Sequence, residues 1–381
     1  MIPYGSHTLS EEDIDAVTEV LKHEFLTQGK QVPAFEQALC QYTGADFAVA
    51  CNSGTSGLHI ACLAAGVGAS DVVWTVPNSF AASANCARYC GAKIDFVDID
   101  PRTRNICTSA LVDKLYLAAA ENKLPKAIIV VHFAGISCDM AAISAITEPF
   151  GITLIEDAAH ALGAKDALGN TVGAGKYSAM TVLSFHPVKS ITSAEGGAVL
   201  TNDEELASLL KRYASHGITR ETAMLGDAHA EEPWLYAQCE LGFNYRLSDV
   251  HAALGRSQLK HLDGFVARRY ELATIYDQAL AGLPVIRPVL DPNSAWHLYV
   301  IELTAHDRKQ VFNALRERGI GVNVHYIPIH LHPYYQQLGF KPGQFPNAEN
   351  YYRCALTLPL FPTLSADNQM EVIKQLSEVL S

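Results

Sequence analysis

The sequence predicts an α/β protein: a mostly parallel sheet covered by helices on both faces, followed by a smaller C-terminal α+β domain. Three observations support this fold class. Apolar strands alternate with helical patterns over residues 45–200. Two of these strands, 72–76 and 93–97, flank a helix over 79–89, an arrangement that predicts parallel pairing. Apolar residues make up 49% of the 381-residue chain and charged residues 18%, which suits a well-buried globular protein.

The elements of the first half follow from local signals. Three signals predict a helix over 10–24: Ser10 can cap it, Asp13 lies in its first turn, and its apolar residues fall on one face. The run AIIVVHF at 127–133 is typical of a strand buried on both faces. The other expected strands are 47–51, 72–76, 93–97, 151–156, 180–185 and 198–200. The other expected helices are 32–42, 58–65, 79–89, 111–120, 140–147 and 203–214.

The second half is less regular. Residues 216–241 form a polar, loop-rich stretch, and a long helical region over 248–280 follows it. The tail carries strand and helix patterns that we place at 298–303, 308–318, 321–326 and 366–380. We therefore expect two domains, a large one over 1–255 with the N-terminal segment and a small one over 256–381.

Charge and cysteine content narrow the functional classes. The formal net charge is −12, which argues against general binding of nucleic acid or of an anionic membrane. The N-terminus lacks a basic region followed by an apolar core, and no apolar run approaches the length of a membrane span. The nine cysteines are scattered and include no CxxC pair, which favours free thiols in a reducing cytoplasm.

The stretch 183–197, LSFHPVKSITSAEGG, contains the strongest chemical signal. Its one lysine, Lys189, follows the apolar run 180–185 and has no acidic residue after it until Glu195. A lysine at the end of a buried strand loses hydration, so its amine becomes easier to deprotonate. A lysine that forms a Schiff base needs this property. Taken alone, the same position would also suit a lysine that extends from a turn into solvent.

Other residues near strand ends could serve a ligand next to this lysine. Asp157 follows the strand 151–156, where a carboxylate either meets a cation such as a protonated pyridine nitrogen or caps the next turn. His160 could reach a phenolic oxygen of such a ring or could be structural. The turn NSGTSG at 52–57 precedes a helix, so it is either a phosphate cradle or an ordinary N-cap. Phe80, at the start of the next helix, is either a lid on the ligand or a core aromatic.

Several other chemistries lack their parts. The stretch GAGKY at 173–177 misses the first glycine and the final hydroxyl residue of a P-loop, and 66–68 lacks the third glycine of a dinucleotide fingerprint. A serine-hydrolase GxSxG motif does not occur. His325, His330 and His332 have no accompanying thiolate or carboxylate in the pattern of a closed site, so we expect no metal.

Together these stretches resemble the DegT-type family of sugar-nucleotide aminotransferases, which have the fold type I pyridoxal-phosphate architecture. The resemblance runs along nearly the whole chain, and its pieces stand in the order found in the family. They are FLTQGKQVPAFEQAL, NSGTSGLHIA, SFAASANCA, IEDAAHALG, SFHPVKSITSAEGGAVLTN, LGFNYRLSDVHAALGRSQL and NVHYIPIHLHPYY.

The resemblance implies a role for each matching residue. Lys189 would be the catalytic amine and would form a Schiff base with pyridoxal 5′-phosphate. Within the cofactor site, Asp157 would hold the pyridine nitrogen, His160 would approach the phenolic oxygen and Phe80 would stack on the ring. The phosphate end would be held by Gly54, Thr55, Ser56, Ser184 and, from the neighbouring subunit, Asn244. The sugar-nucleotide pocket would be lined by Tyr4, Glu24, Phe25, Leu26, Thr27, Gly54, Ser184, Asn244, Asn323, Val324, His325 and Tyr326.

The implied activity is transamination of a nucleotide sugar by a cytoplasmic homodimer with shared active sites. VHFAGISCDM, SHGITR and HYIPIHLHPYYQQLGF resemble the members of pseudaminic acid biosynthesis. Those members use L-glutamate to aminate a UDP-linked 4-keto-6-deoxy N-acetylhexosamine, giving UDP-4-amino-4,6-dideoxy-N-acetyl-beta-L-altrosamine and 2-oxoglutarate. The alternatives are an aminotransferase for another UDP- or TDP-keto sugar, at C3 or C4, and a non-catalytic regulator on the same fold. A dehydrase of the family would lack Lys189.

Overall fold

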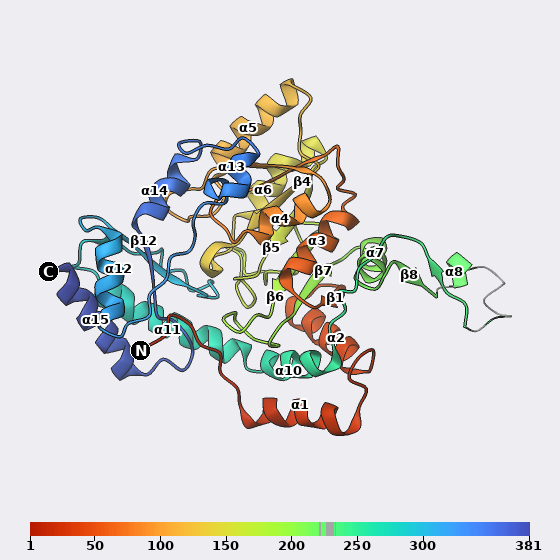
Figure 1. Cartoon of the computed structure of the whole chain (residues 1–381), viewed down its shortest axis with the longest axis horizontal. Helices are drawn as coiled ribbons and strands as arrows, with labels where there is room; N and C mark the ends of the chain where they lie inside the picture. The colour runs from red at the N-terminus through yellow and green to blue at the C-terminus, as the bar shows by residue number, and fades with distance from the viewer. Residues whose placement is uncertain (221, 226–231, 233) are drawn as a thin grey trace.

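A seven-stranded sheet forms the centre of the protein in the computed structural model, which describes residues 1–220, 222–225, 232 and 234–381 (Figure 1). The strand order is β1-β7-β6-β5-β4-β2-β3. β7 runs antiparallel to β1 and β6, and the other neighbouring pairs are parallel. The strands are β1 (Phe47–Cys51), β2 (Val72–Thr75), β3 (Lys93–Phe96), β4 (Ala127–Val131), β5 (Thr153–Asp157), β6 (Met180–Ser184) and β7 (Gly197–Thr201). The expectation of a mostly parallel sheet is confirmed.

Helices cover both faces of this sheet because its strands are apolar on both sides. In β4, Ile129 packs toward α3 and α4, whereas Ile128 and Val130 pack toward α5 and α6. One face is covered by α3 (Gly54–Ala64), α4 (Ala82–Tyr89) and α7 (Glu204–Ala214). The other face is covered by α2 (Gln31–Thr43), α5 (Thr108–Ala120), α6 (Met140–Thr147) and α10 (Asp249–Leu259). The short 3-10 helices Phe133–Gly135 and Glu148–Phe150 follow β4 and α6.

A second, antiparallel sheet of three strands lies in the C-terminal part of the chain. Its strands are β10 (Val285–Ile286), β11 (Tyr299–Leu303) and β12 (Ala355–Leu358). The helices here are α11 (Leu262–Ala279), α12 (Arg308–Glu317), the 3-10 helix Ile329–Leu331, α13 (Pro333–Gln337), α14 (Pro346–Cys354) and α15 (Ala366–Leu380). Residues of α11, α12 and α15 share one apolar core with β11 and β12, and both chain termini lie on this side (Figure 1).

Two segments extend from the main body. Helix α1 (Glu11–His23) packs against α10 and is closed at its start by a capping box between Ser10 and Asp13. The small hairpin of β8 (Ile218–Thr219) and β9 (Ala237–Gln238), with α8 (Thr222–Leu225), projects away from the sheet at the right of Figure 1. Parts of the predicted loop-rich stretch, 221, 226–231 and 233, lie outside the described residues.

Two element predictions were wrong in their bounds or type. The expected helix 248–280 is two helices. Helix α10 ends where the N–H groups of Lys260 and His261 donate to carbonyls three residues earlier, those of Ser257 and Gln258, as in a 3-10 turn. The predicted boundary after residue 255 falls within α10, and the division into two domains stays a prediction. The expected strand 321–326 is irregular, and Asn323 pairs with Thr357 in an isolated bridge.

Three helix starts also differ from the sequence prediction, and α5 begins at Thr108 rather than at 111. Helix α3 begins at Gly54 rather than at 58, because Ser53 is extended and its side chain accepts a hydrogen bond from the Ser56 N–H. Small residues that favour turns therefore form the first turn of a helix. Helix α4 begins at Ala82, so Phe80 lies in the loop before the helix rather than at its start. Within the described residues, no helix combines the length and apolar character that crossing a bilayer demands.

Candidate active site

A cavity of about 460 Å³ lies at the carboxyl ends of β5 and β6, beside the start of α3. Ligands of open α/β sheets bind at this edge. The residues that the sequence analysis assigned to a site and that line the cavity are Tyr4, Gly54, Thr55, Phe80, Asp157, His160, Ser184, Lys189, Asn323, Val324, His325 and Tyr326. The chain thus brings together residues from both its N-terminal and C-terminal parts.

Lys189 lies in the loop that joins β6 to β7 and faces this cavity. Burial lowers the pKa of the Lys189 amine to about 8, and the negative charge of Asp157 partly opposes that change. The main-chain N–H of Lys189 donates to the His186 carbonyl at 2.8 Å, which holds the loop in a tight turn. The free amine is therefore accessible near neutral pH, as nucleophilic and acid–base chemistry requires.

Asp157 is the last residue of β5 and is 6% exposed. Side chains alternate along a strand, so Asp157 points to the face covered by α3 and α4, as Ile155 does. Its Oδ2 accepts a hydrogen bond from Ser83 Oγ at 2.6 Å, and Ser79 Oγ lies 2.7 Å from Ser83 Oγ. Its Oδ1 accepts from the Ala159 N–H at 3.2 Å. These hydrogen bonds fix the carboxylate at the cavity wall.

The start of α3 forms a small concave surface with β6. A Cβ atom at Gly54 would lie 2.9 Å from the Cβ of Ser184, so the helix can approach the strand this closely because residue 54 is glycine. The hydroxyl residues Thr55 and Ser184 line the cavity here. Ser56 does not line it, because its Oγ donates to Asn52 Oδ1 at 2.6 Å and lies 2.9 Å from Ser53 Oγ. Helix N-termini with such hydroxyl groups bind anions.

His160 lies at the inner wall of the cavity. Burial lowers the pKa of its imidazole well below the usual value, and the charge of Lys189 adds to that effect. Its Nε2 lies 3.1 Å from Tyr326 Oη, and its Nδ1 accepts from the Ala134 N–H at 3.3 Å. The ring of His297 lies 4.2 Å from the ring of His160, centroid to centroid.

The segment 323–326 and Tyr4 form the wall contributed by the chain ends. Burial lowers the pKa of His325 to about 4, and the charge of Lys189 acts in the same direction. His325 Nδ1 lies 2.8 Å from Thr357 Oγ1, and its ring packs 5.4 Å from the Tyr4 ring. Phe80 is 62% exposed at the mouth, with its ring 6.3 Å from that of Tyr326. A flat ring bound in the cavity would therefore have Phe80 as an aromatic neighbour.

The other predicted site residues lie away from this cavity within one chain. Glu24 borders a separate open cavity of about 520 Å³ between α1, α2 and α10, where it pairs with Lys30 at 3.0 Å. The neighbouring Phe25, Leu26 and Thr27 are exposed; Phe25 is 79% exposed. Asn244 is exposed near the projecting hairpin, and its carbonyl accepts a hydrogen bond from Asn52 Nδ2 at 3.4 Å.

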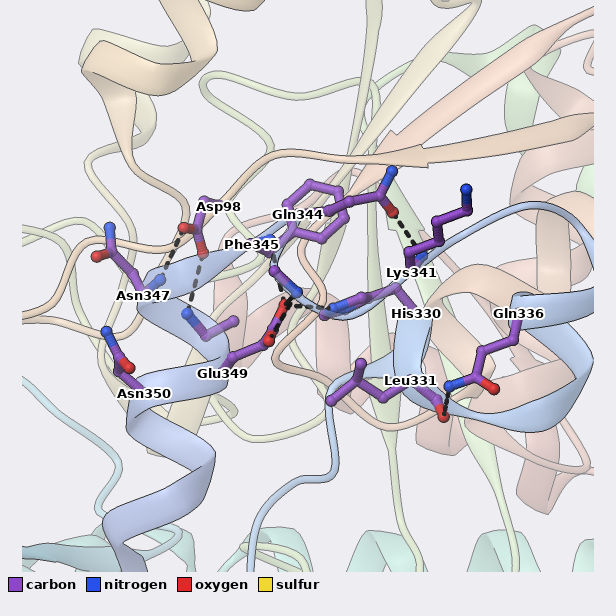
Figure 2. Close-up of polar contacts among 12 residues, drawn as sticks. Asp98, His330, Leu331, Gln336, Lys341, Gln344, Phe345, Asn347, Glu349 and Asn350 are labelled. Carbon is purple, nitrogen blue, oxygen red and sulfur yellow. Dashed lines mark hydrogen bonds and ion pairs between the residues drawn. The ribbon is translucent and has the colours of Figure 1, made fainter.

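Two of the three clustered histidines have separate side-chain partners, Thr357 for His325 and Glu349 for His330. His330 is buried, and its Nε2 lies 3.0 Å from Glu349 Oε1 (Figure 2). Glu349 also accepts from the Gly343 N–H, while Asp98 accepts from the first turn of α14 (Figure 2). Among the described residues, no group of three or more His, Cys, Asp or Glu side chains is arranged to hold a metal ion.

Three further residues, Ser79, Ser83 and His297, shape the cavity without having been predicted from the sequence. Ser83 holds Asp157, and the signal that could have indicated it is the spacing of Ser79 and Ser83 by one helical turn. His297 lines the cavity next to His160 and is 4% exposed. No pattern in its apolar surroundings distinguishes it from a core residue.

Known proteins share this fold. The structure of PseC from Helicobacter pylori, described as an aminotransferase involved in the biosynthesis of pseudoaminic acid, superposes with a TM-score of 0.90 at 32% identity, covering 100% of this chain and 99% of that chain. The PLP-form of the putative sugar aminotransferase Spr1654 from Streptococcus pneumoniae superposes with a TM-score of 0.88 at 26% identity, covering all of both chains. Together with the site, these likenesses define the class as a fold type I aminotransferase.

The chain belongs to the DegT/DnrJ/EryC1/StrS aminotransferase family, whose model matches residues 7–377. A UDP-4-amino-4,6-dideoxy-N-acetyl-beta-L-altrosamine transaminase from Campylobacter jejuni is 41% identical over 365 residues, covering 94% of this chain and 92% of the relative. The spore coat polysaccharide biosynthesis protein SpsC from Bacillus subtilis is 38% identical over 390 residues, covering 100% of this chain and 97% of that protein.

Proposed function

We propose that this protein is a pyridoxal-phosphate-dependent transaminase that moves the amino group of L-glutamate to C4 of a UDP-linked 4-keto-6-deoxy N-acetylhexosamine. The products would be UDP-4-amino-4,6-dideoxy-N-acetyl-beta-L-altrosamine and 2-oxoglutarate. The observation that carries the reaction class is the buried Lys189, with a pKa of about 8, in one cavity with the carboxylate of Asp157. The choice of sugar is supported by the Campylobacter transaminase at 41% identity.

The residues around the cavity fit pyridoxal phosphate. Gly54 allows the start of α3 to approach Ser184, where a Cβ would lie only 2.9 Å from the Ser184 Cβ, and the hydroxyls of Thr55 and Ser184 line the cavity beside it, as a phosphate needs. Asp157, fixed by Ser83, suits a protonated ring nitrogen. When bound, this cofactor supplies a ring that withdraws electrons from the reacting carbon.

Within this assignment, Lys189 is the group that moves protons. Its Nζ takes the proton from Cα of glutamate and, in the second half of the reaction, delivers a proton to C4 of the sugar. A pKa of about 8 suits both tasks, since the general acid and the general base are then present together near neutral pH. The neutral rings of His160 and His325 keep further positive charge away from this amine.

A second copy of the chain would complete the site. Phe25, Leu26, Thr27 and Asn244 are exposed, Glu24 is half-buried, and all five lie outside the wall of their own cavity. We assign them to the partner's site, where Asn244 would contact the cofactor phosphate and the segment 24–27 the sugar nucleotide. The protein would thus act as a homodimer. Its nine free cysteines are consistent with our proposal that it works in the cytoplasm.

The test is a substrate panel. Purified protein is incubated with the cofactor, L-glutamate and UDP- or TDP-linked sugars that carry the ketone at C4 or C3, and products are identified by mass and NMR. We expect a 4-amino product from the UDP-linked 4-keto sugar. Lys189→Ala should yield none, whereas Lys176→Ala, at an exposed lysine bonded to Asn170, should match the wild type. A product from another sugar would reassign the substrate, and no product from any would reject transamination in favour of the regulator.

A further inference from the structure

His297 lies in the cavity and has no role in the function proposed above. It precedes β11, and its side chain is 4% exposed. Its ring centroid lies 4.2 Å from that of His160 and the two ring planes are tilted by 40°, so the imidazoles are in contact. Its Nδ1 is buried and makes no hydrogen bond within the described part of the chain. Burying a polar atom without a partner is unfavourable, so such a residue requires an explanation.

The hydrogen bonds of His160 define which of its nitrogens carries the proton. The Ala134 N–H donates to Nδ1 at 3.3 Å, so Nδ1 is an acceptor. A neutral imidazole has one N–H, which must then be on Nε2. Nε2 lies 3.1 Å from Tyr326 Oη and donates to it. His160 thus presents a single N–H toward the cavity.

One turn, residues 133–135, holds both histidines. Ala134 donates to His160, and its carbonyl accepts from the His297 N–H at 3.0 Å. Gly135 makes this junction possible, because a Cβ there would lie 2.8 Å from the Trp296 nitrogen and 3.1 Å from the His160 carbonyl oxygen. The backbones that carry the two imidazoles are therefore fixed relative to each other.

His297 itself resists protonation. Burial and the charges nearby lower the pKa of its imidazole well below the usual value. A proton added at Nδ1 would create a buried N–H without an acceptor, which adds a further cost. The ring consequently remains an uncharged surface that keeps water from one face of His160.

We propose that His297 is a positioning residue whose ring, held by the turn 133–135, keeps His160 in the neutral form with its proton on Nε2. The proposal rests on the function proposed above: the cavity that His160 lines would hold the cofactor, and the resemblance to the family implies that His160 approaches its phenolic oxygen. The charged or titratable groups around His160 are Lys189, His325, Tyr326, Asp157 and His297 itself, with Arg269 behind His297. Burial, Lys189 and His325 all oppose protonation of His160.

The test compares His297→Ala, which removes the ring, with His297→Phe, which keeps an aromatic ring without nitrogen. NMR of cofactor-free protein with ¹⁵N-labelled histidine follows His160, and a His160→Gln variant assigns its signals. We expect wild type and His297→Phe to show a neutral, Nε2-protonated His160 down to pH 5. In His297→Ala water reaches the ring, so its pKa should rise toward 6.5, and roughly three quarters of the rings should be charged at pH 6. The acid limb of the pH profile of kcat/KM should move to higher pH in the same variant.

Three results would overturn the proposal. They are a wild-type His160 that titrates near pH 6.5, a His297→Ala protein in which the His160 signals are unchanged, and a His297→Phe protein as disturbed as His297→Ala. The first needs no variant, so it holds even where His297→Ala does not fold. Because the NMR experiment uses no sugar and no cofactor, a failure of the proposed transamination would leave its outcome unaffected.

Discussion

The pKa of Lys189 leads to a quantitative prediction about reactivity. Burial lowers it from 10.5 to about 8. At pH 7 the fraction of free amine then rises by roughly 300-fold, since each unit of pKa is a factor of ten. The Asp157 carboxylate acts in the opposite direction and raises the pKa of the lysine. Asp157→Asn, which keeps the shape of the side chain, should therefore increase the free amine further.

The assay is competitive labelling of the cofactor-free protein with a trace of acetic anhydride over pH 6 to 11, followed by peptide mass spectrometry. The labelling rate of each lysine follows its own fraction of free amine. Lys123 is the internal control, because its exposed amine pairs with Glu121 and that pairing raises its pKa. We expect Lys189 to reach half of its maximal rate near pH 8, and Lys123 to do so above pH 10.5.

Two outcomes would refute the reasoning. If Lys189 labels in parallel with Lys123 up to pH 10, the amine is hydrated and the cavity does not lower its pKa. If Asp157→Asn moves the midpoint of Lys189 to higher pH, the carboxylate does not stabilise the charged amine. Either result would remove the physical basis for assigning proton transfer to Lys189.

Three further predictions concern the cradle, the cavity wall and the assembly. Gly54→Ala should destabilise the fold by about 1–3 kcal/mol and weaken cofactor binding, because its Cβ would lie 2.9 Å from Ser184 of β6. The control is Gly264→Ala on α11, where a Cβ would meet no other atom, and this variant should be more stable than wild type by about 1 kcal/mol. A urea titration measures both changes. The pKa of His325 is about 4 in the folded protein, below the 6.5 of the unfolded chain, so protonation of the unfolded chain destabilises the fold as pH falls from 6.5 toward 4. The His325→Gln variant lacks this effect, and between pH 7 and 5 its free energy of unfolding should fall less than that of wild type, by up to about 2 kcal/mol. Mixed dimers of Asn244→Ala and Lys189→Ala should regain part of the activity that each variant lacks, and no recovery would contradict a shared site.

Local signals in the sequence were sufficient where a capping residue was present. Helices over 140–147 and 366–380 are confirmed, and each begins after a side chain that accepts a hydrogen bond from its first turn, Asp139 and Ser365. Helices α13 and α14 were missed although each has a proline in its first turn, a known start signal. Strand β12 was missed because four residues are too few for a pattern and its pairing partner β11 lies more than fifty residues earlier.

The site was partly predictable for the same reason. The lysine loop, the carboxylate at the end of β5 and the helix start at Gly54 are local features, and all three meet at the cavity. Contacts between distant segments were not visible in the sequence. His160 and Tyr326 are 166 residues apart in the chain, and Ser83 is 74 residues from Asp157. Such pairs depend on strand order, which local patterns do not encode.

The charge of the cavity agrees with the second subunit of the proposed function. The proposed ligands are a nucleoside diphosphate sugar, a phosphate-bearing cofactor and a dicarboxylic amino acid, all of them anions. Among the described residues of the wall, Lys189 is the single lysine or arginine, and the carboxylates of Asp157 and Glu195 lie in the same wall. The start of α3 can neutralise one phosphate by its backbone N–H groups. The rest of the negative charge of these ligands is not balanced by residues of this wall. Because the chain has a net charge of −12, the simplest source of positive charge is a group of lysine or arginine side chains from a partner copy.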